Sequence, residues 1–158
     1  MIITTWNVTG MNSKGKQRYL KERLKSDNPN IMLIQETKLR ESKLREVMNN
    51  FKPHYEIMGQ DATGSAGGVT ILWYPEEVQF EDFTSIPRIL SGRFKILGSQ
   101  VWILLSNIYG PHIQSERRAL LQNLEIIQSL YPASSWIVGG DFNMIKSLNK
   151  KKGGLKRS

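Results

Sequence analysis

The chain contains no cysteine and only two histidines among its 158 residues. The absence of cysteine excludes a disulfide framework and any zinc site built on thiolates. No apolar run approaches the ~20 residues that a membrane-spanning helix needs, so we expect no membrane partner. The sequence starts directly with a core-type strand, which predicts an intracellular protein without a signal or transit peptide. Neither an internal repeat nor a low-complexity linker is found, and the length predicts one domain.

Positive charge exceeds negative charge by 8, and the excess is unevenly distributed. Residues 146–158 carry six Lys or Arg and no acid, and residues 14–52 carry eleven bases and five acids. Residues 53–145 are acidic, with five bases and nine acids. A basic region around the first helix and a basic tail both fit contact with a phosphate backbone. A solvated helix face and a frayed terminus would show the same composition.

The apolar pattern predicts alternating strands and helices. Strands are expected at 1–6, 31–34, 55–58, 69–73, 78–83, 92–97, 100–107 and 135–138, and helices at 16–25, 41–50 and 115–130. The turn Gly98-Ser99 predicts a hairpin between two of these strands. The third helix carries an apolar stripe of five residues, Leu120, Leu121, Leu124, Ile127 and Leu130. This order predicts an α/β (α+β) fold, a mixed sheet with helices on its outer face.

Four of the expected strands end in polar side chains. Asn7 follows the first strand, Gln35-Glu36-Thr37 the second, Asn107-Ile108-Tyr109-Gly110-Pro111-His112 the segment 101–106, and Gly139-Gly140-Asp141-Phe142-Asn143 the last. In stacked sheets such strand ends gather at one crevice, where ligands bind. We therefore expect five residues far apart in sequence to converge: Asn7, Glu36, Tyr109, Asp141 and Asn143.

In this order, and together with Gly67-Gly68-Val69, these motifs resemble the endonuclease/exonuclease/phosphatase superfamily. They are most similar to the apurinic/apyrimidinic-like endonuclease domains of LINE-type (non-LTR) retrotransposons. The resemblance runs from Met1 to about Gly154 and covers about two-thirds of such a domain. It implies a four-layer α/β sandwich of the DNase I-like type, incomplete, with mixed sheets flanked by helices. The domain would occupy residues 1–145, and the basic tail 146–158 resembles a truncated loop.

The resemblance also implies site chemistry, a DNA partner and a nuclear location. Mg²⁺ prefers oxygen ligands and takes only one or two carboxylates, so the implied ligand of Mg²⁺, or Mn²⁺, is Glu36. Asp141 is implied as the base for the attacking water, with Asn143 holding the water or the phosphate. Tyr109 would donate to a phosphoryl oxygen, and Asn7 would orient Glu36 or bind the phosphate.

Each of these residues also suits a purely structural role. The Glu36 segment suits a helix start, and Tyr109-Gly110-Pro111 is ordinary turn chemistry. Asn7 suits an Asx turn at a strand end, and the segment around Asp141 suits a polar turn after a core strand.

Three further residues are candidates for contact with nucleic acid. Lys38 and Arg40 follow Glu36 and are expected at the rim of the crevice. His112 follows the turn after Tyr109 and could donate to a phosphate, or could be a solvent-facing loop residue.

The resemblance calls for a C-terminal Asp-His pair, and this sequence has no histidine after His112. The converging residues would then form half a site, and we expect weak activity or none, because losing members of a catalytic set costs orders of magnitude. The sequence therefore leaves three candidate functions open. They are a metal-dependent DNA endonuclease of retrotransposon type, a superfamily phosphatase acting on phosphoinositides or similar phosphoesters, and a non-catalytic retroelement remnant.

Overall fold

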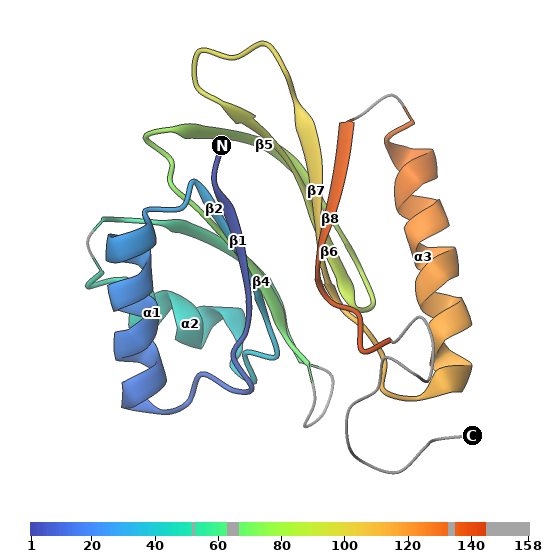
Figure 1. Ribbon diagram of the computed structural model, residues 1–158, viewed down its shortest axis with the longest axis horizontal. Helices are drawn as coiled ribbons and strands as arrows, with labels where there is room; N and C mark the ends of the chain where they lie inside the picture. The colour runs from blue at the N-terminus through green and yellow to red at the C-terminus, as the bar shows by residue number, and fades with distance from the viewer. Residues whose placement is uncertain (52, 63–66, 133–134, 145–158) are drawn as a thin grey trace.

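The computed structural model describes residues 1–51, 53–62, 67–132 and 135–144 (Figure 1). Among these residues, no helix combines the length and the apolar character that crossing a membrane requires. The basic tail predicted at 146–158 lies outside the described residues.

The described strands form two four-stranded sheets. Sheet 1 has the order β1 (Ile3–Asn7), β2 (Ile31–Gln35), β4 (Val69–Trp73), β3 (Glu56–Gln60). Sheet 2 has the order β5 (Val78–Ile86), β6 (Ile89–Ile96), β7 (Ile103–Tyr109), β8 (Ser135–Asp141). The pairs β1–β2 and β7–β8 are parallel, and the other pairs are antiparallel. Both sheets are therefore mixed, as the sequence predicts.

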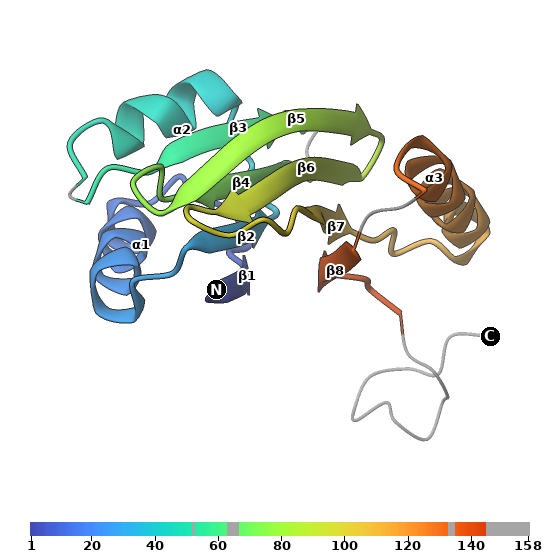
Figure 2. The ribbon, with the colours of Figure 1, turned by 90° about the horizontal axis from the view of Figure 1, so that it is seen from above.

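Helices cover the outer faces of the stacked sheets, so the fold has four layers (Figure 1). The helices α1 (Lys14–Asp27) and α2 (Glu41–Met48) pack on sheet 1. The 3-10 turn η1 (Gln114–Glu116) leads into α3 (Arg117–Leu130), which packs on sheet 2 (Figure 2). The DNase I-like sandwich expected from the sequence is confirmed.

Three apolar cores separate the four layers, and strand alternation supplies them. On β2, Met32 and Ile34 face the helices of sheet 1, while Ile31 and Leu33 face sheet 2. On β7 the same alternation sends Leu105 toward sheet 1 and sends its neighbours toward α3. Because β2 and β7 are buried on both faces, they read in the sequence as continuous apolar runs.

Helix α1 shows why its boundaries fall where they do. The Ser13 hydroxyl accepts from the backbone N–H of Lys16 at 3.3 Å and caps the first turn. At the other end Asn28 adopts a left-handed conformation with φ 42°, and Pro29 follows, so the helix cannot continue.

Some local expectations are wrong. Leu121 and Leu130 are 53% and 55% exposed, so the inward face of α3 is narrower than its apolar stripe. The strand expected at 78–83 continues to Ile86, and the next begins at Ile89, because the chain turns tightly at Pro87 and Arg88. Pro87 prevents continued pairing there, whereas the expected strands 78–83 and 92–97 left eight residues between them.

The parallel pairs place four strand ends at one end of the sandwich. β1, β2, β7 and β8 all run toward the lower end of the molecule in Figure 1. β1 and β8 contact each other across the two sheets. The polar residues that follow these strands therefore meet between the sheets.

Candidate functional site

Asn7 and Asp141 join the ends of the two sheets. The Asn7 side-chain Nδ2 donates to Asp141 Oδ2 at 2.7 Å, although the residues are 134 positions apart. Asn7 Oδ1 accepts from the backbone N–H of Thr9 at 3.0 Å, which is the Asx turn that the sequence also allowed. One side chain thus serves both roles: it turns the chain after β1 and orients the Asp141 carboxylate.

The segment Glu36–Lys38 is held in a rare backbone conformation at the end of β2. Glu36 and Lys38 have φ of 58° and 53°, a region that non-glycine residues seldom occupy. Backbone hydrogen bonds fix them, because Gly10 N donates to Glu36 O at 2.7 Å and Lys38 N donates to Gly67 O at 3.3 Å. A helix start is excluded, since α2 begins only at Glu41. Local strain of this kind persists only where the surroundings impose it, and it is common at functional sites.

Tyr109 is the last residue of β7, at the end of the sandwich where the polar strand ends meet. It is 3% exposed and pairs in register with Asp141 on β8. Burial, followed by the negative charges of Glu36 and Asp141, raises the pKa of the Tyr109 hydroxyl. The hydroxyl therefore stays protonated and remains a hydrogen-bond donor at neutral pH. Glu36 and Asp141 lie at the same end of the sandwich, because Asn7 bonds Asp141 and pairs in register with Gln35, the residue before Glu36.

Asn143 and His112 lie at the margin of this cluster. The Asn143 backbone N–H donates to Asp141 Oδ1 at 3.0 Å, and its side chain donates to Gly110 O at 2.8 Å. Asn143 and Asn7 therefore each bond one of the two carboxylate oxygens of Asp141. His112 is exposed, and its Nε2 lies 3.1 Å from the Tyr109 hydroxyl.

Lys38 is exposed and forms an ion pair with Glu36. Its Nζ is 3.1 Å from Glu36 Oε1, and the Glu36 side chain is only 16% exposed. The acid thus already attracts a cation, as a site of concentrated negative charge does. Arg40 is exposed at the N-terminal boundary of α2, and no hydrogen bond or ion pair between described residues connects it to Glu36 or Asp141.

A row of three amides separates the site from the core between the sheets, and the sequence reading missed it. Asn7, Gln35 and Gln60 lie at one level of sheet 1, because Gln35 pairs with Asn7 and both Gln35 and Gln60 pair with Val69. Each amide donates a hydrogen bond to sheet 2. Asn7 donates to Asp141, Gln35 to Asn107, and Gln60 to the β5–β6 turn. We call these residues the amide row. A buried Gln at a strand end was the available signal.

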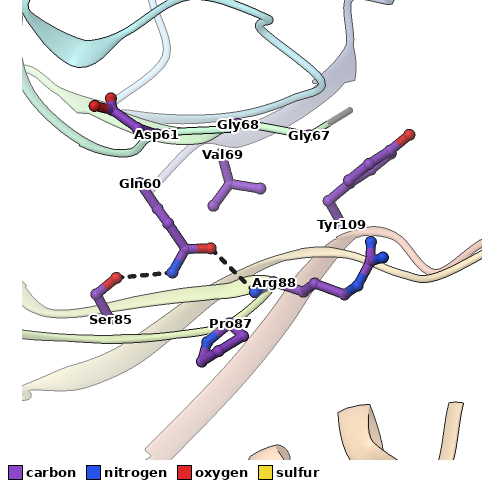
Figure 3. Close-up of a pocket in the computed structure, with 9 residues that line it drawn as sticks. All are labelled: Gln60, Asp61, Gly67, Gly68, Val69, Ser85, Pro87, Arg88 and Tyr109. Atoms are coloured by element: carbon purple, nitrogen blue, oxygen red, sulfur yellow. Dashed lines mark hydrogen bonds between the residues drawn. The ribbon is translucent and has the colours of Figure 1, made fainter. Parts of the chain in front are cut away.

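A pocket of about 540 Å³ opens beside Tyr109 (Figure 3). Its polar wall comes from the end of β3 and the β5–β6 turn, including Gln60, Asp61, Ser85 and Arg88. Gly67, Gly68, Val69 and Pro87 complete the lining. Gln60 holds the wall together, since its Nε2 donates to Ser85 Oγ at 2.7 Å and its Oε1 accepts from Arg88 N at 3.0 Å.

The oxygen donors at the site fit a hard divalent cation. Glu36 offers a largely buried carboxylate, whose charge is paired with Lys38 in this structure. In the part of the chain that the structure describes, no three His, Asp or Glu residues form a metal-binding group. The single carboxylate of Glu36 nevertheless suits Mg²⁺, because this ion usually binds through one or two carboxylates and keeps its other positions for water and phosphate.

Comparison with known sequences gives one family. The profile of the Endonuclease/Exonuclease/phosphatase family matches residues 4–158. No curated protein sequence matches the chain.

Solved structures with this fold come from several kinds of enzyme. Zebrafish TDP2 in complex with a single-strand DNA product superposes with a TM-score of 0.69 at 21% identity, over 92% of this chain and 62% of that one. A mannosyl-6-phosphatase from Bacteroides thetaiotaomicron gives 0.71 at 16%, over 90% and 65%. The human Nocturnin catalytic domain with a bound sulfate gives 0.64 at 14%, over 89% and 62%. The chain thus spans less than two-thirds of the length of each of these structures. At these low identities, the likeness shows a shared fold and nothing beyond it.

Proposed function

Because the chain belongs to the Endonuclease/Exonuclease/phosphatase family, we propose that it is a divalent-metal-dependent phosphodiester hydrolase whose substrate is DNA. One observation carries this proposal most directly. Two carboxylates, Glu36 after β2 and Asp141 at the end of β8, meet at the end of the sandwich beside the buried Tyr109: Tyr109 pairs in register with Asp141, and Asn7 bonds Asp141 while pairing with the residue before Glu36. An acid pair around a hydrogen-bond donor is what hydrolysis of an anionic ester requires.

Each residue has a role in this proposal. Glu36 would hold Mg²⁺ or Mn²⁺, which when bound neutralises charge on the phosphoryl oxygens. Asp141, oriented by Asn7 and Asn143, takes the proton from the attacking water. Tyr109 donates a hydrogen bond from its hydroxyl to a phosphoryl oxygen.

The surroundings of the acids fit a nucleic-acid substrate. The pocket beside Tyr109 has room for the nucleotide next to the scissile phosphate, and Arg88 lies at its wall (Figure 3). Lys38, Arg40 and His112 add positive charge or donors near the ends of the strands. DNA binding to such a surface falls with rising salt, since bound cations of the DNA are released. Zebrafish TDP2, which has the same fold, binds single-strand DNA product.

Nicking of supercoiled plasmid tests the proposal, because it detects a single cut per molecule and therefore slow turnover. We expect nicking with Mg²⁺ or Mn²⁺, its loss on addition of a chelator, and its loss in Asp141→Ala. The control is Glu125→Gln, which removes an exposed carboxylate from α3 and should leave nicking unchanged. A folded sample that leaves plasmid intact with either metal would sink the proposal and favour a non-catalytic remnant.

We further propose that the chain is an endonuclease domain of LINE type, acting in the nucleus. The sequence motif Asn107-Ile108-Tyr109-Gly110-Pro111, which resembles LINE-type domains, supports this narrower assignment. Cleavage of target DNA at a preferred sequence, rather than at random positions, would support it, and uniform cleavage would count against it.

A phosphatase acting on a small phosphoester is the second candidate, and the pocket favours it. Asp61 and Arg88 in one wall would suit a ligand carrying both hydroxyl and phosphate groups. A mannosyl-6-phosphatase shares the fold. Release of inorganic phosphate from inositol phosphates or mannose 6-phosphate, without plasmid nicking, would select this function.

A further inference from the structure

Asn107 is a buried side chain between the two sheets, and its amide makes three hydrogen bonds. It is fully buried on β7, and its Nδ2 donates to Ile34 O on β2 at 3.0 Å and to Thr70 O on β4 at 2.9 Å. Its Oδ1 accepts from Gln35 Nε2 at 2.7 Å. Both donor hydrogens and the acceptor of one amide are thus used, and every partner belongs to the opposite sheet.

The three bonds hold β7 at one position. A buried amide that loses its partners pays the full cost of desolvation, so β7 cannot slide along sheet 1 without leaving these groups unpaired. A shift by one residue would turn the Asn107 side chain to the opposite face. The apolar contacts between the sheets carry no such directional requirement, because the hydrophobic effect is not directional.

This connection lies immediately beside the candidate site. Gln35 precedes Glu36 in sequence, and Asn107 lies two residues before Tyr109 on the same face of β7. A strand rises roughly 3.3 Å per residue, so the bond is about one residue from the acid and two from the tyrosine. The other members of the amide row lie at the edges, where Asn7 bonds Asp141 and Gln60 bonds the β5–β6 turn.

We infer that Asn107 is a positioning residue: its buried amide fixes β7 against β2 and β4 and so sets the placement of Tyr109 relative to Glu36. Among the described residues, the side-chain partners of Asn107 all lie in the sandwich interior. Its effect on metal binding and turnover, which rests on the proposed function, passes through Glu36 and Tyr109.

The neighbouring residue on the same strand provides a matched control. Ser106 is equally buried, but its hydroxyl bonds within sheet 2, to Ser91 Oγ at 2.6 Å and from Trp136 Nε1 at 2.9 Å. It faces α3 rather than sheet 1, since successive side chains alternate. Ser106→Ala therefore removes buried hydrogen bonds from β7 without touching the connection between the sheets.

The test compares Asn107→Ala with Ser106→Ala in the full 158-residue chain. Both should lower the unfolding midpoint, because both leave buried polar groups unpaired. Only Asn107→Ala should shift the backbone ¹⁵N–¹H resonances of Glu36, Thr37 and Lys38. It should also weaken Mn²⁺ binding, followed by the electron paramagnetic resonance of the free ion, about 10- to 100-fold, as loss of a supporting contact does.

Asn107→Thr covers the case in which the alanine variant does not fold. Threonine suits a strand and retains one hydroxyl donor, so an intermediate shift of the same resonances is expected. Wild-type resonances at Glu36–Lys38 together with wild-type Mn²⁺ affinity in a destabilised Asn107 variant would overturn the inference. If the wild-type chain binds no Mn²⁺, the metal part of the proposed function is wrong, and the resonance comparison alone decides the role of Asn107.

Discussion

Asn7 and Asp141 form a 2.7 Å hydrogen bond between the ends of β1 and β8, so the first and last described strands share one polar contact. The bond requires a donor at position 7, because ionised Asp141 can only accept. Asn7 is thus more than a turn residue, and its replacement is informative about the acid it orients.

Asn7→Asp should destabilise the protein at neutral pH, because it places a second carboxylate against Asp141. Like charges at this separation raise the pKa of the pair in the folded state. A carboxyl group whose pKa is raised in the folded state contributes stability at low pH, and this contribution disappears as pH rises. The destabilisation of Asn7→Asp relative to wild type should therefore be small at pH 4 and about 1–3 kcal/mol at pH 7. Urea unfolding at the two pH values measures it. Asn7→Ala is the control, and its destabilisation should vary far less between these pH values.

Glu36→Gln should abolish the metal dependence of activity with little effect on folding. The substitution keeps the shape of the side chain but removes the charge that would hold the cation and that now pairs with Lys38. We expect plasmid nicking to fall at least about 100-fold, the scale on which loss of one electrostatic group acts. Rates over a Mg²⁺ series measure it. An unchanged Mg²⁺ dependence would show that Glu36 is not the ligand.

The raised pKa of Tyr109 predicts a pH-dependent contribution to stability. The folded state binds the phenolic proton more tightly than the unfolded chain, whose tyrosine has its ordinary value of 10.0. The contribution is therefore fully present below pH 10 and is lost as pH rises through the folded pKa. Tyr109→Phe removes it, so the stability difference between wild type and variant should shrink between pH 9 and 11. Denaturant unfolding at both pH values checks this, and a constant difference would contradict it.

Two glycines at the site should not tolerate a side chain. A Cβ on Gly110 would clash with the carbonyl of Phe142, and one on Gly140 with the backbone of Ile108. Gly140 also has a φ of 131°, which other residues avoid.

We expect Gly110→Ala and Gly140→Ala each to cost about 1–3 kcal/mol, the usual range for steric substitutions. Gly15→Ala is the matched control. Nothing lies within 4 Å of its added methyl group in α1, and the change should stabilise by about 0.4–1 kcal/mol. Thermal unfolding of the three variants gives the order. Equal stability of all three would show that the backbone adjusts at the strand ends.

Most of the site residues that the sequence predicts to converge lie at the ends of apolar strands. An apolar strand followed by Asn7, Glu36, Tyr109 or Asp141 is visible locally, and the parallel pairing of β1–β2 and β7–β8 does bring these residues together. Their placement follows from the fold, whereas their catalytic roles stay predictions.

Two features could not be read from the sequence, for different physical reasons. The connection from Gln35 to Asn107 joins residues 72 positions apart, and no local pattern specifies which buried amide meets which. Leu120, Leu124 and Ile127 of α3 pack into the core on sheet 2, whereas Leu121 and Leu130 are exposed. Helical spacing identifies an apolar stripe but not the width of the surface that covers it.

The bond between Asn7 and Asp141 also bears on how the protein is made. Synthesis proceeds from the N-terminus at about 5–20 residues per second, so the asparagine leaves the ribosome many seconds before its aspartate. During that interval β1 lacks its neighbour from sheet 2, and the acids have not yet been brought together. Assembly of the acidic cluster is thus a late event in biogenesis, and a nascent chain is expected to gain any cleaving capacity only after β8 has emerged.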